Sequence, residues 1–166
     1  MRLACIGCGA RAQTYMRLAS LRPDRFEIVA GAAPTSENVE KIRAISKNRA
    51  FRGFSDARAM LACGKIADVL IIATPDRLHH ANCLEALAVG YDVLLEKPIA
   101  TTPAEVMDVV RAGRGSRRRV MLCFVLRFAA FYRKAREIVR SGEIGDIISI
   151  QASEGVGPWH QAHSFV

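Results

Sequence analysis

Short runs of consecutive apolar residues alternate along the chain with longer segments in which apolar positions recur every three or four residues. The continuous runs predict strands that are buried on both faces, as in a parallel sheet. They cover residues 3–6, 26–32, 69–73, 92–95 and 120–125, with a further strand expected at 50–54. The helical pattern covers residues 10–21, 36–46, 77–89 and 103–112. This alternation predicts an α/β fold with a doubly wound parallel sheet, whose ligand would lie outside the carboxyl ends of its strands.

Local signals at the helix ends agree with these boundaries. Thr102-Pro103-Ala104-Glu105 has the pattern of a capping box with proline at the first helical position. Gly90 and Gly113 stand where two helices are expected to end.

The pattern changes after Val125. Residues 127–140 form a basic amphipathic stretch that ends at Ser141-Gly142, and residues 147–153 alternate apolar and polar, which predicts a strand with one solvated face. One strand cannot bury that face alone. We therefore expect residues 1–125 to form a first domain, and residues 126–166 to be the beginning of a truncated α/β substrate domain.

Composition narrows the class of protein. With 51% hydrophobic and 24% charged residues among 166, the chain is typical of globular rather than disordered proteins. No apolar run approaches the roughly 18 residues that a membrane-spanning helix needs, and the N-terminus lacks the regions of a signal peptide. We expect a cytoplasmic protein without a membrane partner.

The net charge of +8 raises the alternative of a nucleic-acid partner. Much of the excess lies close to one predicted helix end, at Arg111, Arg114, Arg117, Arg118 and Arg119. Basic residues there compensate the helix dipole, and no nucleic-acid-binding motif accompanies them. We therefore expect no nucleic-acid partner.

Five cysteines, an odd number, make a disulfide framework a poor explanation. Cys5 and Cys8 form a C-x-x-C pair, which raises redox and metal alternatives. We expect the two thiols to be apart, because Cys5 points from a buried strand whereas Cys8 occupies the following turn. His79, His80 and Cys83 have helical spacing, but no second ligand group accompanies them, so no metal site is predicted.

The first predicted strand runs directly into Gly7-Cys8-Gly9-Ala10-Arg11-Ala12 and then into a helix. This G-x-G-x-x-A pattern is typical of dinucleotide binding. Gly7 allows the tight turn, Gly9 lets the backbone approach a pyrophosphate, and Ala12 lets the helix pack close to the strand. The free N–H groups of the helix N-terminus favour phosphate. The alternative is a tight turn without a ligand.

Two further loops follow predicted strands, Thr74-Pro75-Asp76 and Glu96-Lys97-Pro98, and in a doubly wound sheet they converge with the glycine turn on one crevice. Thr74 can approach a dinucleotide, or the loop can be a helix entry with Asp76 as N-cap. Lys97 follows a buried strand and is flanked by a carboxylate and a rigid proline, which favours a role in proton transfer. The alternative for Lys97 is a surface pair with Glu96.

These motifs together resemble the Gfo/Idh/MocA oxidoreductases, a family named for glucose–fructose oxidoreductase and inositol dehydrogenase. The resemblance covers the whole chain and is carried by Gly7-x-Gly9-x-x-Ala12, Ala73-Thr74-Pro75-x-x-x-His79, Gly90-Tyr91-Asp92-Val93-Leu94-Leu95-Glu96-Lys97-Pro98 and Ser141-Gly142-Glu143-Ile144-Gly145. It implies an N-terminal Rossmann domain, a C-terminal α/β domain with an open antiparallel sheet, and NAD(P)-dependent chemistry on sugars, cyclitols or related compounds. It also implies that Lys97 bridges nicotinamide and substrate, and that the cofactor is lined by Gly7, Gly9, Arg11, Thr74, Pro75, His79 and Glu96.

The chain departs from the family pattern at several positions. The second strand ends at Ala33 instead of a carboxylate, and Thr35 and Ser36 follow, so repulsion of a ribose 2′-phosphate is removed and NADP is favoured slightly over NAD. Arg127 matches the arginine that follows the sixth strand in the family, without the asparagine found two residues before it in many members. His160 and His163 lie in a polar tail, and the acid/base histidine of the family is expected beyond Val166.

We therefore expect the cofactor-binding portion of an NAD(P)-dependent oxidoreductase that acts on a sugar, cyclitol or related polyol. Residues 1–166 alone would bind cofactor without turnover, and the intact protein is compatible with a homo-oligomer. The alternative is a noncatalytic dinucleotide-binding module, such as a sensor or an assembly partner.

Overall fold

Six parallel strands form one sheet in the computed structural model, which describes residues 1–155 and 157–158. The strands are β1 (Arg2–Ile6), β2 (Glu27–Ala32), β3 (Arg52–Phe54), β4 (Val69–Ile72), β5 (Asp92–Leu95) and β6 (Val120–Leu122). Their order across the sheet is β3-β2-β1-β4-β5-β6, and each neighbouring pair is parallel. The order reverses between β1 and β4, so the doubly wound parallel sheet is confirmed.

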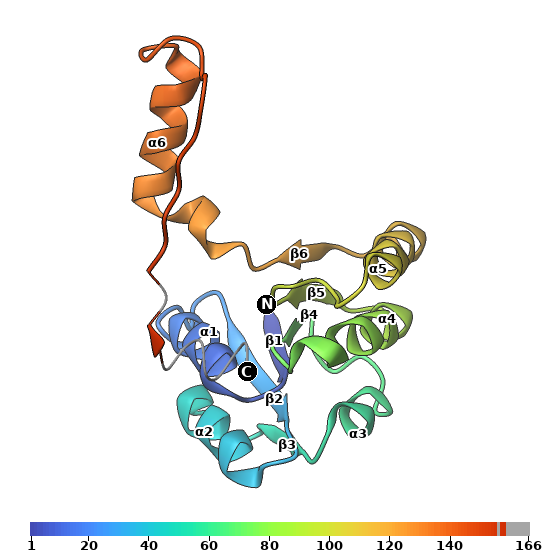
Figure 1. Cartoon of the computed structure of the whole chain (residues 1–166). Coiled ribbons are helices and arrows are strands. Elements are labelled where there is room, and N and C mark those ends of the chain that lie inside the picture. Colours follow the sequence, from blue (N-terminus) through green and yellow to red (C-terminus); the bar gives the residue numbers. More distant parts are fainter. Residues whose placement is uncertain (156, 159–166) are drawn as a thin grey trace. The chain divides into compact units, whose positions relative to one another are not determined.

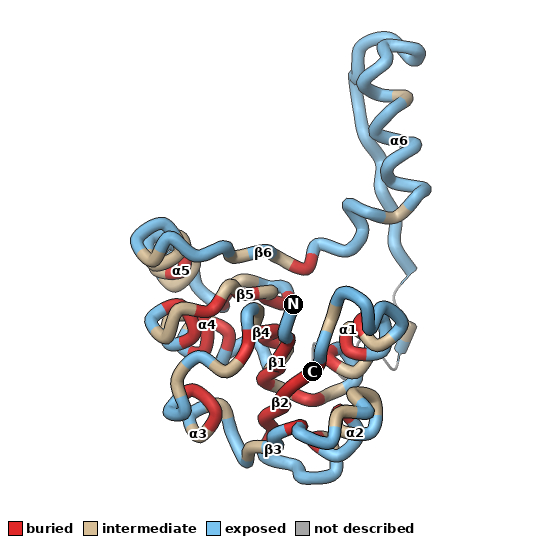
Figure 2. The backbone as a smooth tube through the Cα atoms, turned by 180° about the vertical axis from the view of Figure 1, so that it is seen from behind, coloured by how far each residue is buried: buried red, intermediate tan, exposed pale blue. Residues whose placement is uncertain are grey.

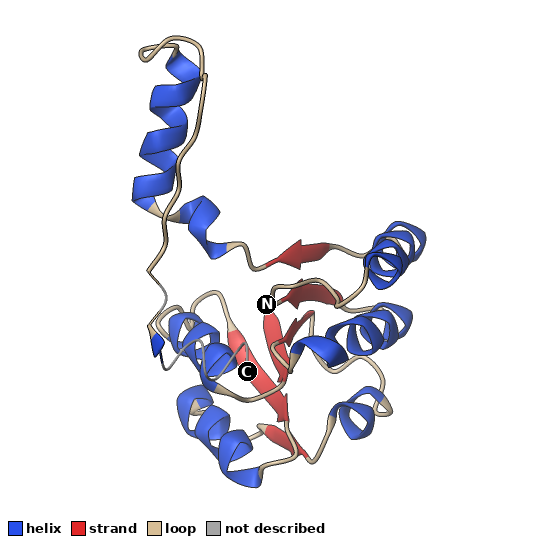
Figure 3. Ribbon diagram, in the orientation of Figure 1, coloured by secondary structure: helices blue, strands red, loops and turns tan. Residues whose placement is uncertain are grey.

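Helices cover both faces of this sheet (Figures 1 and 3). The helical segments are α1 (Ala10–Ser20), α2 (Ser36–Ser46), α3 (Ala57–Leu61), the 3₁₀ turn η1 (Asp76–Leu78), α4 (His79–Val89) and α5 (Pro103–Ser116). Helices α1 and α2 lie on one side, whereas α3, α4 and α5 lie on the other. The sequence pattern did not predict α3.

The core divides into two layers, one on each face of the sheet. Alternate residues of β1 show why: Leu3 and Cys5 belong to the layer under α1 and α2, whereas Ala4 and Ile6 belong to the layer under α3, α4 and α5. Figure 2 shows that the buried residues follow the strands and the inner sides of the helices. Both faces of β1 are therefore buried, which explains its uninterrupted apolar sequence.

An apolar hollow of about 490 Å³ remains beside α1. Its lining includes Leu3, Leu18, Ile71, Leu94 and Met121, which come from α1 and from four neighbouring strands. This part of the sheet carries no helix of residues 1–124, whereas the opposite face is covered by α4 and α5.

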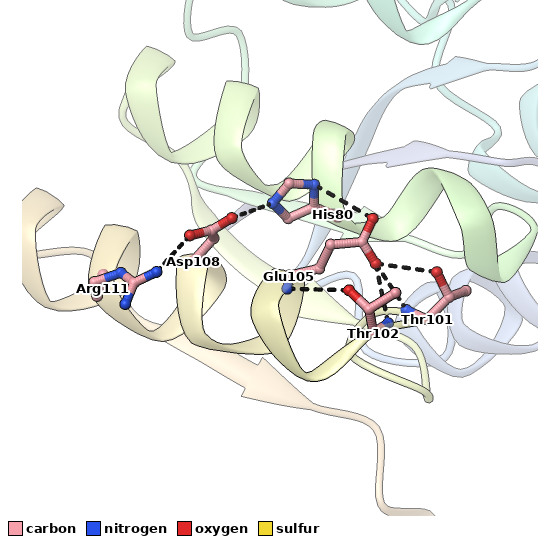
Figure 4. A network of polar contacts seen from close by, with 6 residues as sticks. All are labelled: His80, Thr101, Thr102, Glu105, Asp108 and Arg111. Atoms are coloured by element: carbon pink, nitrogen blue, oxygen red, sulfur yellow. Dashed lines mark hydrogen bonds and ion pairs between the residues drawn. The ribbon is translucent and has the colours of Figure 1, made fainter.

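A polar network joins the outer surfaces of α4 and α5 (Figure 4). His80 Nε2 lies 3.3 Å from Asp108 Oδ2, and His80 Nδ1 lies 3.9 Å from Glu105 Oε1. Glu105 also completes the capping box, because its backbone N–H donates to Thr102 Oγ1 and its carboxylate accepts from the backbone N–H of Thr102. The predicted start of α5 is thus confirmed.

The predicted end of α5 is wrong. Gly113 lies inside the helix, which continues to Ser116 and ends at Arg117 in the left-handed conformation with φ of 56°. Gly113 does not adopt the positive φ that a glycine has when it ends a helix. Gly90, in contrast, ends α4 with φ of 99°, as predicted.

The chain divides into two units, Met1–Phe124 and Val125–Val166. In the second unit a 3₁₀ turn, η2 (Val125–Phe128), precedes α6 (Ala130–Ser141), and no described residue is buried. The strand predicted at residues 147–153 does not form, and Ile148 and Ile150 are 92% and 84% exposed. Among the described residues, no strand pairs with this segment, and a strand needs a hydrogen-bonded neighbour.

Candidate functional site

Gly7 and Gly9 fulfil different requirements at the carboxyl end of β1. Gly7 has φ of +84°, and a Cβ there would lie only 2.5 Å from the carbonyl oxygen of Ala73. The turn is therefore packed directly against the loop after β4, and the fold itself requires glycine. Gly9 is the N-cap of α1 in an extended conformation, and a Cβ at this position would have no neighbouring atom within 4 Å. The protein itself has room for a side chain at Gly9.

The open space at Gly9 fits a phosphate group. It lies at the N-terminus of α1, where free backbone N–H groups and the helix dipole favour an anion. Gly9 provides no capping side chain that would satisfy these groups. Ala12 is fully buried in the layer between α1 and the sheet, as the close-packing explanation of the motif predicts. The residues present therefore fit the pyrophosphate of a dinucleotide.

The loop after β4 lies next to the glycine turn. Thr74 is half-buried, and its hydroxyl accepts a hydrogen bond from Asn82 Nδ2 at 3.4 Å, whereas Pro75 is exposed. Asp76 begins η1, and the N-cap of α4 is Leu78, so the alternative role of Asp76 as the cap of this helix is not observed.

His79 joins this loop to the loop after β5. The ring is fully buried, with Nε2 2.9 Å from the carbonyl oxygen of Thr74 and Nδ1 2.6 Å from that of Pro98. Both nitrogens thus face backbone carbonyls. A direct contact between His79 and a cofactor stays a prediction, and its role in the structure is to hold two site loops together.

Glu96 is the buried carboxylate of the site. It follows β5 directly and is 7% exposed. Its Oε1 accepts a hydrogen bond from the Tyr15 hydroxyl and lies 3.3 Å from Arg11 Nε, whereas its Oε2 accepts the backbone N–H of Lys97 at 3.0 Å. Lys97 itself is exposed. The alternative of a surface pair is thus wrong for Glu96, because its carboxylate is buried between α1 and the Lys97 backbone.

Tyr15 is the functional candidate that the sequence did not reveal. Burial raises the pKa of its hydroxyl well above the usual range, and Cys123 and Glu96 raise it further. The hydroxyl therefore stays protonated and available as a donor. The only sequence signal was its position on the inner side of a predicted helix, three residues after Ala12. A contact between residues 81 positions apart is not visible in a local pattern.

The expectation that the Cys5 and Cys8 thiols lie apart is wrong. Both are buried, and their sulfur atoms are 3.8 Å apart as free thiols. The positive φ of Gly7 turns the chain so that Cys8 joins Cys5 in the layer under α1 and α2. The hydrogen bond between them raises the pKa of Cys5, with burial, and lowers that of Cys8.

The remaining predicted residues have different surroundings. At the end of β2, Ala33 is buried, whereas Thr35 and Ser36 are exposed at the start of α2. Arg127 lies in η2, within the second unit. His160 and His163 lie outside the described residues.

In residues 1–155 and 157–158, no three His, Cys, Asp or Glu side chains are grouped so that they could hold a metal ion. Within the same residues, no helix combines the length and apolar character needed to cross a membrane.

Comparison with known proteins decides the family. A model of the Gfo/Idh/MocA oxidoreductase family, described as having an NAD-binding Rossmann fold, matches residues 1–124. The chain belongs to this family. The match covers the sheet and each of the three loops that follow β1, β4 and β5.

Individual family members support the same assignment. The chain is 32% identical over 98 residues to a putative oxidoreductase, YteT, of Bacillus subtilis, covering 59% of this chain and 23% of that protein. It is 34% identical over 105 residues to inositol 2-dehydrogenase of Leifsonia xyli, covering 63% and 30%. The matched segments thus span less than a third of the length of these two relatives.

Solved structures of the family have the same fold. The WlbA dehydrogenase of Bordetella pertussis, in complex with NADH and UDP-GlcNAcA, matches with a TM-score of 0.80 and 28% identity, over 89% of this chain and 44% of that chain. Scyllo-inositol dehydrogenase of Lactobacillus casei, with NAD(H) and scyllo-inositol, matches in fold with a TM-score of 0.79 and 21% identity, over 89% and 43%. The family assignment and the NADH-bound neighbour support a nicotinamide dinucleotide as the cofactor.

Proposed function

We propose that this chain is the cofactor-binding part of a nicotinamide-dependent oxidoreductase that acts on a sugar, cyclitol or related polyol. The observation that carries the proposal is the open space at Gly9, which lies at the N-terminus of α1 and beside the turn that Gly7 packs against the β4 loop. The fold does not use this space, and its N–H groups favour phosphate.

The bound dinucleotide would accept or supply the hydride in the reaction. Gly7, Gly9 and Ala12 shape the turn for the pyrophosphate, with Arg11 at the first turn of α1 as a neighbouring cation. Thr74 and Pro75 form the adjoining wall. His79 joins this wall to the loop that carries Glu96 and Lys97.

Lys97 is the residue that we assign to proton transfer. When a secondary alcohol is oxidised, the carbon loses a hydride to the cofactor and the oxygen loses its proton, which the neutral amine of Lys97 would receive to become an ammonium; reduction reverses both transfers. The exposed position of Lys97, next to a backbone fixed by Glu96, suits contact with a substrate. The substrate class rests on the inositol and sugar dehydrogenases among the relatives.

The test is to follow nicotinamide absorbance in the intact protein with a panel of polyols and sugars. Lys97→Ala should lower kcat by at least about a hundredfold, because general acid–base catalysis contributes roughly 10² to 10⁴ in rate. The matched control is Lys65→Ala. Lys65 is also exposed, but it precedes the start of β4, whereas Lys97 follows the end of β5. Equal kcat values for wild type and Lys97→Ala would contradict the assignment of Lys97.

The second candidate function is a noncatalytic dinucleotide-binding module. It is favoured by the fact that the described binding elements all lie within residues 1–124. Tight NADH or NADPH binding by the intact protein, without turnover of any compound in the panel, would support the module. Turnover would exclude it.

A further inference from the structure

The contacts of Tyr15 indicate a role beyond packing. It lies in the second turn of α1, half-buried, and its hydroxyl donates to Glu96 Oε1. Glu96 uses its other oxygen, Oε2, to accept the backbone N–H of Lys97 at 3.0 Å. One buried carboxylate therefore connects a tyrosine of the first helix to the backbone of the lysine after β5.

Two donors share Glu96 Oε1, but they differ in exposure. Arg11 Nε lies 3.3 Å away, and the Arg11 side chain is 51% exposed at the first turn of α1. A phosphate at that turn would compete with Glu96 for this guanidinium. Tyr15 approaches from the inner side of the helix, and its hydroxyl is a neutral donor that a phosphate attracts less strongly than a guanidinium. Tyr15 is thus the donor that keeps Glu96 in place in either case.

We propose that Tyr15 is a positioning residue of the site, which fixes the Glu96 carboxylate and thereby holds the Lys97 backbone in the position needed for proton transfer. The part of this inference that concerns turnover rests on the proposed function. The part that concerns the Lys97 backbone does not, since it follows from the hydrogen bonds alone.

The first experiment measures hydrogen exchange of the Lys97 amide by NMR in the 166-residue chain. Tyr15→Phe removes only the hydroxyl, so Glu96 loses a donor and the Lys97 amide should exchange about tenfold faster or more, as expected when a hydrogen bond to a charged group is lost. Tyr91→Phe is the matched control. It removes another tyrosine hydroxyl, which accepts from Ile66 N and donates to Gly64 O at 2.9 and 3.0 Å. Tyr91 precedes β5, whereas Lys97 follows the opposite end of that strand.

The second experiment measures turnover of the intact protein. Tyr15→Phe should lower kcat about tenfold while the KM for the dinucleotide changes less than about threefold, because the glycine turn is untouched. Tyr91→Phe should leave both constants close to wild type even where it lowers stability. A general loss of stability would affect the two tyrosine variants alike.

The outcomes separate the two ideas. Lys97 amide exchange in Tyr15→Phe that equals that of wild type or of Tyr91→Phe would overturn the positioning role, and so would faster exchange with an unchanged kcat. If the amide responds to Tyr15→Phe but the wild-type protein neither binds a dinucleotide nor turns over, the proposed function fails, while the control of the Lys97 backbone by Tyr15 is supported.

Discussion

Asp92 and Glu96 lie at opposite ends of the same strand, and their carboxylates have different surroundings. Asp92 begins β5 and accepts hydrogen bonds from Arg119 N, Nε and Nη2 at 3.0, 2.9 and 2.6 Å, while the Arg119 side chain remains 85% exposed. Glu96 follows the end of β5, is buried, and is held by Tyr15, Arg11 and the Lys97 N–H.

The same contrast holds for the two ends of the parallel strands. We call the side of the sheet where the strands begin the amino edge, and the side where they end the carboxyl edge. At the amino edge the polar groups bind neighbouring strands, as where Asp68 Oδ2 accepts the backbone N–H of Arg2 at 2.7 Å. At the carboxyl edge the polar groups connect loops, as where His79 contacts Thr74 O and Glu96 accepts the backbone N–H of Lys97. The amino edge therefore contributes stability, whereas the carboxyl edge combines stability with the binding site that we propose.

The largest expected effect is at the carboxyl edge. Gly7→Ala should lower the free energy of unfolding by about 3 kcal/mol or more, because a Cβ would lie 2.5 Å from Ala73 O at a positive φ. Gly64→Ala is a matched control, since Gly64 also has a positive φ, of +72°, but a Cβ there would have nothing within 4 Å. It should cost about 1 kcal/mol. Urea unfolding followed by circular dichroism measures both, and equal losses would contradict the close contact between the two loops.

A smaller effect is expected at the amino edge. Asp92→Asn should lower stability by about 1 kcal/mol at neutral pH, because the exposure of Arg119 limits what this ion pair contributes. The Arg119 backbone N–H, together with its side chain, lowers the pKa of Asp92 below its usual range.

The pH dependence of this effect follows from the direction of the pKa shift. A lowered pKa in the folded state stabilises the protein above the unfolded pKa of about 3.9, and that contribution is lost as the pH falls through the lower folded value. The difference between wild type and Asp92→Asn should therefore shrink as the pH falls from 7 to about 2. A difference that grows towards acid pH would contradict the sign.

The smallest expected effect concerns the choice of cofactor. Because Ala33, Thr35 and Ser36 supply no carboxylate after β2, we predict that NADP binds no more weakly than NAD. Thr35→Asp, at the exposed N-cap of α2, should shift the ratio of the two dissociation constants towards NAD by several-fold through repulsion of the 2′-phosphate. A preference of wild type for NAD of tenfold or more in a calorimetric titration would show this prediction to be wrong.

Local sequence signals predicted some features of this structure and missed others. Periodicity predicted the strands and most helices, the glycine motif predicted the turn after β1, and the capping box at Thr102 predicted the start of α5. Each of these signals lies in the same short segment as the feature that it predicts. Helix α3 was missed because five residues are too few for a helical period, although Asp56 caps it by accepting the Ala59 N–H at 2.7 Å.

Two of the failures are non-local. The bond from Tyr15 to Glu96 joins residues 81 positions apart. The strand predicted at residues 147–153 has a suitable alternation but no neighbouring strand among the described residues. Such features depend on which segments meet in three dimensions, and a single sequence does not record that.

We propose that Gly9 is required by a ligand, whereas Gly7 is required by the fold. The most direct test is a calorimetric titration of NADH and NADPH into the wild-type chain and into Gly9→Val. The backbone at Gly9 is extended, with φ of −72° and ψ of −172°, and has room for a side chain, so the variant should unfold within about 1 kcal/mol of wild type. We predict that it remains folded but no longer binds either dinucleotide at concentrations that saturate wild type. Unchanged affinity in a folded Gly9→Val would contradict the dinucleotide site at this turn.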